Sequence, residues 1–275
     1  MSQLLHIDTD EMRAKFAREP FLLRHELVGH PLTSLEALAE LAEEVPLDLI
    51  EHNVGEVPEV ADPDALPQAD LPPGEIVRGI ETNGCWIVIP IHASPRYESF
   101  LDDLIGEVRP LLRPEEGEIR YQQGVFLLSA PGKVTPTHVD SEQGFLLQFK
   151  GDKEIRLGQF ADPTTRAIEI EGVHAGGHRN LSQMPEEMTP FQLDPGDGVH
   201  VPGFYPHMVK NGDSVSLSIN FAFLTDATIR HRTVYSMNAR LRKLGLRPAA
   251  PGVRPRADRR KVRLAKTASK LAPKR

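Results

Sequence analysis

The stretch from Glu118 to Phe223 constrains the fold most, because its short apolar runs alternate with segments that favour tight turns. Pro-Gly pairs, Lys150-Gly151-Asp152 and Asn211-Gly212-Asp213 are typical of connections between antiparallel strands. Ala167–Ile170 is one of the expected strands, and Cys85–Ile91 is another, just upstream. This series of short strands predicts a mainly β fold, either a sandwich or a small barrel.

Helical spacing is found mostly outside that stretch. The sequence predicts a helix over Asp8–Glu19, a second after the capping-box pattern Thr33-Ser34-Leu35-Glu36, and an amphipathic helix over Glu98–Leu112. A further helix is expected from Asp226 to Leu244, with Gly245 as its C-cap.

We expect four segments along the chain. They are an N-terminal helical shoulder with a proline-rich loop (1–75), a β domain (76–225), a C-terminal helix (226–250) and a basic tail (251–275). The tail has little to bury and is predicted to be largely disordered, apart from a helical stretch around 259–271.

The net charge of −7 is the sum of a strongly basic C-terminal region and an acidic remainder of the chain. Residues 229–275 hold 16 Lys and Arg and one acid, Asp258, whereas the rest of the chain holds 16 Lys and Arg and 38 acidic residues. The basic tail is compatible with contact to nucleic acid, docking on an acidic protein surface, or solubility alone. No aromatic residue follows Tyr235, so stacking on bases is not indicated.

The cysteine content and the N-terminal residues indicate the cellular compartment in which the protein is expected. The single Cys85 excludes an internal disulfide, which favours a reducing environment. No signal peptide and no membrane-spanning apolar run are visible in the sequence. We therefore expect a cytoplasmic protein.

Three residues have the composition of a metal site. In a strand, His138 and Asp140 would point the same way, because residues i and i+2 share a face. His207 follows the turn Pro202-Gly203 and can supply a third ligand. Two imidazoles and one carboxylate occupy one face of a mononuclear non-haem Fe(II) centre and leave positions open for substrates.

These residues, with their neighbours, resemble the JmjC-type (cupin-like) Fe(II)/2-oxoglutarate-dependent oxygenases, near the asparaginyl hydroxylase branch. The residues that carry the resemblance are Thr135, His138, Asp140, Lys153, Gly196-Asp197, Pro202, His207 and Asn220. The match covers about Glu118–Phe223. It implies a double-stranded β-helix, or jelly roll, as the fold of the β domain.

The resemblance also implies roles for these residues. His138, Asp140 and His207 would be the catalytic iron ligands, and Lys153 and Thr135 would bind the distal carboxylate of 2-oxoglutarate, with Asn220 near the iron and cosubstrate. The implied reaction uses O₂ to hydroxylate a side chain of a protein, peptide or related metabolite, with release of succinate and CO₂. Demethylation would require the same cofactors. The resemblance further implies a homodimer through the helix at 226–244.

Two departures and two alternative functions accompany this interpretation. His200 replaces an aromatic or aliphatic residue, and Gly144 stands where the asparaginyl hydroxylase branch has an amide. The chain could instead be a metal-dependent cupin enzyme that does not use 2-oxoglutarate, or a non-catalytic regulatory module that binds nucleic acid. His174 and His178 are expected in a loop over the site rather than in a second metal centre.

Overall fold

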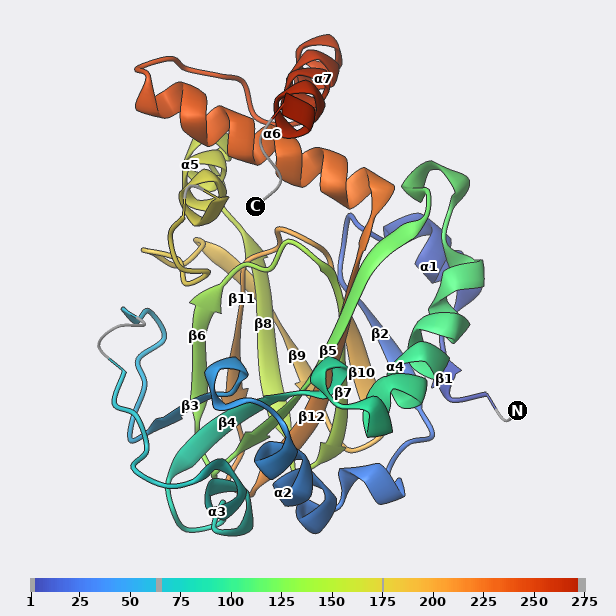
Figure 1. Cartoon of the computed structure of the whole chain (residues 1–275), viewed down its shortest axis with the longest axis vertical. Helices are drawn as coiled ribbons and strands as arrows, with labels where there is room; N and C mark the ends of the chain where they lie inside the picture. The colour runs from blue at the N-terminus through green and yellow to red at the C-terminus, as the bar shows by residue number, and fades with distance from the viewer. Residues whose placement is uncertain (1–2, 63–65, 175, 272–275) are drawn as a thin grey trace.

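The computed structural model describes residues 3–62, 66–174 and 176–271. Two antiparallel sheets face each other in this part of the chain (Figure 1). In spatial order, the large sheet contains β1 (Leu5–His6), β2 (Phe21–His25), β10 (Asp197–Val201), β7 (Gln143–Lys150), β12 (Ser216–Thr225), β5 (Ile119–Ser129), β4 (Cys85–Pro90) and β3 (Glu51–Val54). The small sheet contains β6 (Val134–His138), β11 (His207–Asn211), β8 (Lys153–Gln159) and β9 (Glu187–Leu193). The predicted mainly β, jelly-roll fold class is confirmed.

A two-residue turn takes the chain from the large sheet to the small one. β7 ends at Lys150 and β8 begins at Lys153, so only Gly151 and Asp152 lie between the sheets. Gly151 has a φ of +67°, and a Cβ there would approach the Val215 carbonyl oxygen to 2.5 Å. The turn therefore requires glycine, and it places Lys153 at the start of the next strand.

The space between the sheets is filled from alternate residues of each strand. Ile155 and Leu157 of β8 and Val209 of β11 pack against Leu146 and Val201 of the large sheet. This period of two is expected when one face of each strand is buried against the opposite sheet. Near the cavity described below, the same inward positions carry polar side chains.

Helices cover the outer face of the large sheet. α2 (Leu35–Glu44), α3 (Pro73–Arg78) and α4 (Pro95–Val108) contribute to one hydrophobic core with β4, β5 and β12, and α1 (Thr9–Lys15) lies at its edge. Ser34 caps α2 by accepting a hydrogen bond from the Ala37 amide. Short 3₁₀ turns lie at Pro31–Thr33, Leu47–Leu49, Ile91–Ala93, Arg109–Leu111 and Pro114–Glu116.

Three further helices gather at one end of the sheets (Figure 1). α6 (Asp226–Lys243) follows β12 directly and packs against α5 (Pro163–His174), while α7 (Pro255–Leu271) packs on α6. Tyr235 of α6 lies against Phe204, whose ring centroid is 5.0 Å away. The helices thus cover the segment that leads into β11.

β6 is an edge strand of the small sheet, and other segments pair with its outer side. The Thr137 amide donates to the Glu59 carbonyl at 2.7 Å, and the Thr137 carbonyl accepts from the Leu181 amide at 2.9 Å. The Val139 amide donates to the Arg179 carbonyl at 3.1 Å. These bonds cover an edge that also carries Pro136, a residue common on edge strands.

Several elements differ from the sequence expectations. The N-terminal segment is not only helical, because β1, β2 and β3 extend the large sheet; two to five residues are too few for a clear alternation pattern. Ala167–Ile170 belongs to α5 rather than to a strand, since Asp162 accepts hydrogen bonds from the Thr164 and Thr165 amides and starts a helix there. The tail forms α7 instead of being largely disordered, and its last four residues, 272–275, lie outside the described part.

No helix in the described part of the chain is both long and apolar enough to cross a membrane. The four-segment division and the cytoplasmic location remain predictions.

Candidate active site

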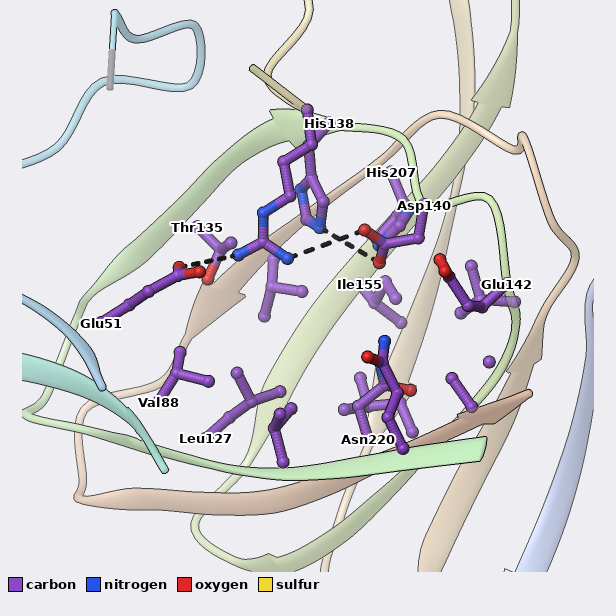
Figure 2. A pocket seen from close by; sticks show the side chains of 18 of the residues that line it. Glu51, Val88, Leu127, Thr135, His138, Asp140, Glu142, Ile155, His207 and Asn220 are labelled. Atoms are coloured by element: carbon purple, nitrogen blue, oxygen red, sulfur yellow. Dashed lines mark hydrogen bonds and ion pairs between the residues drawn. The ribbon is translucent and has the colours of Figure 1, made fainter. Parts of the chain in front are cut away.

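The proposed metal ligands come from two neighbouring strands and the turn that follows one of them. His138 is the last residue of β6, and it lies directly opposite His207, the first residue of β11. Asp140 follows two residues later, and its carbonyl accepts a hydrogen bond from the Phe204 amide at 2.7 Å. Strand pairing and this backbone bond together bring three side chains far apart in sequence to one point (Figure 2).

The ligand atoms of the three side chains lie within 4.8 Å of one another. The Nε2 atoms of His138 and His207 are each 3.8 Å from Oδ2 of Asp140, and the imidazole centroids are 4.0 Å apart. Both imidazoles are almost fully buried. This spacing allows one ion to contact all three side chains.

Backbone carbonyls fix which imidazole nitrogen faces the cavity. Nδ1 of His138 is 2.7 Å from the Pro136 carbonyl oxygen, and Nδ1 of His207 is 2.9 Å from that of Tyr205. Because a carbonyl can only accept, each Nδ1 carries the proton and each Nε2 keeps a free lone pair toward Asp140. Such carbonyl partners are typical of histidines that ligate metals.

The protonation states also suit a cation. Burial lowers the pKa of His138 to about 3, with a contribution from neighbouring His207, and burial likewise lowers the pKa of His207. Burial alone would raise the pKa of Asp140, but His138 and Arg179 hold it below its usual value. At neutral pH the cluster therefore offers two neutral imidazoles and one carboxylate, which are the forms that bind a metal.

Lys153 lies in the same cavity as the ligand cluster. Its side chain is 2% exposed, and Nζ donates a hydrogen bond to Oγ of Ser218 at 2.8 Å. No carboxylate is within ion-pair distance of Nζ in the described residues. Burial lowers the pKa of Lys153 to about 7. A buried ammonium with a hydroxyl as its hydrogen-bond partner is a strong site for an anion.

Thr135 and Asn220 line the cavity from opposite sheets (Figure 2). Thr135 pairs with Val209 in the small sheet, and Asn220 pairs with Leu146 in the large one. Gly144 makes room for this amide, because a Cβ there would lie 3.1 Å from Oδ1 of Asn220. All six predicted site residues thus line one cavity of about 250 Å³, while their individual roles remain predictions.

Sequence reasoning missed several residues of the cavity. Arg179, from the segment after α5, reaches both Asp140 (Nη1 to Oδ1, 3.6 Å) and Glu51 (Nη2 to Oε2, 3.2 Å) across the cavity mouth. Glu142 also faces the cavity, and burial raises the pKa of its carboxyl group (Figure 2). Ser218 does not line the cavity but bonds Lys153, and it could have been inferred from the alternation of β12, because it lies two residues before Asn220.

The three other histidines noted in the sequence, His174, His178 and His200, do not belong to the ligand cluster. His200 stacks on Phe16 and sits among Phe21 and Phe145, with Nδ1 donating to the Gly144 carbonyl oxygen at 3.0 Å, so it behaves as one more ring of the core. His174 ends α5 and packs on Phe204, whereas His178 lies in the following segment beside Arg179. Among the described residues, only His138, Asp140 and His207 form a cluster that could hold a metal.

The comparisons with known proteins agree with this geometry. Residues 116–229 match the family model of the JmjC domain, so the chain carries a JmjC domain, and the resemblance predicted from its sequence is confirmed. No curated protein matches the sequence. The finer placement near the asparaginyl hydroxylase branch stays a prediction.

Structures of one Escherichia coli protein resemble the whole fold. YcfD, described as a ribosomal oxygenase, in complex with cobalt and 2-oxoglutarate has a TM-score of 0.54 and 19% identity, covering 99% of this chain and 69% of that one. Another structure of E. coli YcfD gives a TM-score of 0.56 and 18% identity, covering 99% and 70%. A third, with cobalt and succinic acid, gives 0.52 and 18%, covering 99% and 69%. At these identities the likeness concerns the fold.

Proposed function

We propose that this protein is an Fe(II)- and 2-oxoglutarate-dependent oxygenase that hydroxylates a side chain of a protein. His138, Asp140 and His207 would hold the iron, and Lys153 with Thr135 would bind the distal carboxylate of 2-oxoglutarate. Bound iron, 2-oxoglutarate and O₂ supply the oxidising chemistry: one oxygen atom enters the C–H bond, and the other enters succinate as CO₂ is released.

The observation that carries the proposal is Lys153. A metal-binding cupin that does not use a dicarboxylate has no evident need for an ammonium group buried in the same cavity as its ligands. Burying a cation without an anionic partner is unfavourable, and a bound carboxylate would remove that penalty. Lys153 thus favours 2-oxoglutarate dependence over the cupin alternative, and the complete ligand set argues against a non-catalytic module.

The chain's own residues would position the reactants. The Pro136 and Tyr205 carbonyls orient the two imidazoles, so that the metal would be held by Nε2 of each. Ser218 keeps the ammonium of Lys153 directed by its 2.8 Å hydrogen bond. Apolar side chains such as Val88 and Leu127 line the rest of the cavity and limit the entry of water (Figure 2).

A ribosomal component is the substrate class that the comparisons favour. The E. coli structures are described as those of a ribosomal oxygenase, and they match 99% of this chain. We extend this description to the present chain as part of the proposal.

The test is turnover of 2-oxoglutarate in the absence of any protein substrate. Protein purified anaerobically and loaded with Fe(II) should form succinate slowly, and only after oxygen is admitted. His207→Ala should abolish this activity, whereas His6→Ala, a matched change at a half-exposed histidine of β1, should preserve it.

A spectroscopic measurement separates the alternatives. Anaerobic addition of Fe(II) and 2-oxoglutarate should produce a charge-transfer absorption band in the wild type and none in His207→Ala. If the wild type gave neither the band nor succinate, the oxygenase proposal would be wrong. Fe(II) binding without any effect of 2-oxoglutarate would instead support the cupin alternative.

A further inference from the structure

The helices α6 and α7 carry a concentration of exposed arginines that the proposed reaction does not use. Five exposed arginines, four on α7 and one just before it, form what we call the arginine face: Arg254, Arg256, Arg259, Arg260 and Arg263. In the helix, positions 256, 259, 260 and 263 follow the i, i+3, i+4, i+7 spacing of one face. Within the described residues, no carboxylate lies in ion-pair distance of these five guanidinium groups.

The only acidic residue of α7 does not neutralise the arginine face. Asp258 accepts a hydrogen bond from the Gly252 amide at 2.8 Å and lies 3.4 Å from Nζ of Lys261. Lys261 itself points toward α6, where it donates to Oδ1 of the fully buried Asn238 at 2.6 Å. The carboxylate is therefore used in joining the helices, and the exposed arginines keep their full charge.

Specific contacts fix the two helices to the body of the protein. Asn238 bonds the Ala249 carbonyl oxygen through Nδ2 at 3.0 Å, which ties the connection between α6 and α7 to α6. Arg242 of α6 pairs with the buried carboxylate of Glu171 in α5. The arginine face is thus held on an anchored support rather than on a free tail.

The support lies at the metal-ligand end of the sheets. Tyr235 of α6 belongs to one hydrophobic cluster with Val139, which stands between His138 and Asp140, and with Phe204. Arg232 of α6 acts electrostatically on Glu142 at the cavity. Figure 1 shows α6 lying across this end with α7 on its outer side. A partner bound to α7 would therefore lie on the same end of the molecule as the cavity.

We propose that the arginine face binds the phosphate backbone of RNA. Arginine presents a planar fork of donors that matches phosphate oxygens, and an unpaired row of such groups is the electrostatic footprint of nucleic-acid binding. The absence of aromatic residues after Tyr235 agrees with backbone contact and not with base stacking.

A membrane surface fits the same helix less well. Interfacial helices insert Trp, Phe and Leu from an apolar face. On α7 the side chain of Val262 is partly buried, and Leu264 is the only large apolar side chain that is mostly exposed among those described. The proposal that the arginine face binds RNA rests on the proposed function, because a ribosomal substrate would be presented to the cavity together with RNA.

Binding of a fluorescent single-stranded RNA of mixed sequence, followed by anisotropy with the metal-free protein of 275 residues, tests this proposal. If all five arginines contact phosphates, the logarithm of the affinity should fall against that of the salt concentration with a slope of about −3.5. This corresponds to a loss of about 100-fold between 50 and 200 mM salt. The triple variant Arg256→Gln/Arg259→Gln/Arg263→Gln should lose about 2 units of that slope.

The matched control is Arg13→Gln/Arg18→Gln/Arg109→Gln, which removes the same charge from exposed arginines near α1. The control should bind RNA like the wild type. The proposal would be overturned if both triple variants lost the same RNA affinity or if the arginine-face variant kept the wild-type salt slope. It would also be overturned if the wild type did not bind RNA. Sedimentation with phosphatidylserine vesicles in place of RNA would identify a membrane surface instead. Succinate formation is measured separately, so failure of the oxygenase proposal would be recognised independently.

Discussion

Binding of 2-oxoglutarate should weaken as the pH rises above 7, because the cavity offers the cosubstrate a lysine that is already losing its proton. Burial lowers the pKa of Lys153 to about 7 in the free protein. A carboxylate placed against Nζ would favour the charged form and raise that pKa toward its ordinary value or beyond. Binding would then be coupled to uptake of a proton.

The size of the effect follows from that pKa. At pH 6.5 most of the Lys153 side chain is protonated, whereas at pH 8.5 only about 3% is, if the pKa is about 7. The dissociation constant for 2-oxoglutarate should therefore rise about 25-fold over this interval, equivalent to about 2 kcal/mol. Proton uptake should approach about 0.9 per molecule bound at pH 8.

Calorimetric titration measures both quantities. 2-Oxoglutarate is added anaerobically to protein saturated with Co(II), in buffers of different ionisation enthalpy, so that the buffer dependence of the heat gives the protons taken up. Saturating metal keeps the ligand histidines from contributing. Lys153→Arg is the matched variant, because a guanidinium stays protonated throughout, and the affinity that it retains should not depend on pH.

A dissociation constant in the wild type that stays constant between pH 6.5 and 8.5, with no proton uptake, would refute the reasoning. It would mean either that Lys153 is fully charged in the free protein or that the carboxylate binds elsewhere. The Lys153→Arg titration distinguishes these cases, since a distant site would leave its affinity equal to that of the wild type.

Three other changes have expected outcomes. Asp140→Ala should weaken Co(II) binding by 100-fold or more in a metal titration, because it removes the only carboxylate of the ligand cluster; retention of wild-type affinity would show that the metal binds elsewhere. Lys153→Met should raise the free energy of unfolding of the ligand-free protein by about 1–4 kcal/mol in urea denaturation while abolishing 2-oxoglutarate binding, since it removes a buried charge. Arg242→Met should lower the free energy of unfolding by about 3–5 kcal/mol, because it leaves the carboxylate of Glu171, 2% exposed, without its partner. The double variant Glu171→Gln/Arg242→Met should recover most of that loss, and failure to do so would assign the effect to packing.

The candidate site could be predicted from sequence where the local geometry of a strand or a tight turn determines it. The spacing of His138 and Asp140 and the turn before His207 carried the prediction that the three side chains meet. The strand register places His138 opposite His207, whereas Asp140 lies beyond the end of β6 and is held by the bond from the Phe204 amide to its carbonyl oxygen. Lys153 could be placed because a two-residue turn leaves little freedom between β7 and β8. For His138, His207 and Lys153, which lie at strand ends, a local rule fixes the direction of the side chain.

Residues brought in by long connections could not be predicted in this way. Arg179 reaches Asp140 only because the segment after α5 pairs with β6, and no periodicity in the sequence records that pairing. β2 was not predicted for a related reason. It pairs with β10, which lies more than 170 residues away in sequence, and no local pattern indicates that pairing. The tail was expected to be disordered because its charge dominates its composition, whereas two polar contacts, from Lys261 and Asn238, secure its helix to α6.

The segment 179–181 is hydrogen-bonded along the outer edge of β6, the strand that carries His138. The amide of Val139, between His138 and Asp140, is protected from solvent by the Arg179 carbonyl, and the amide of Leu181 by the Thr137 carbonyl. Whenever that segment detaches, both amides become free to exchange their hydrogens with water, whereas amides bonded between β11 and β8 do not. The rate of hydrogen–deuterium exchange at the amides of Val139 and Leu181 would therefore report how often the segment 179–181 detaches from β6.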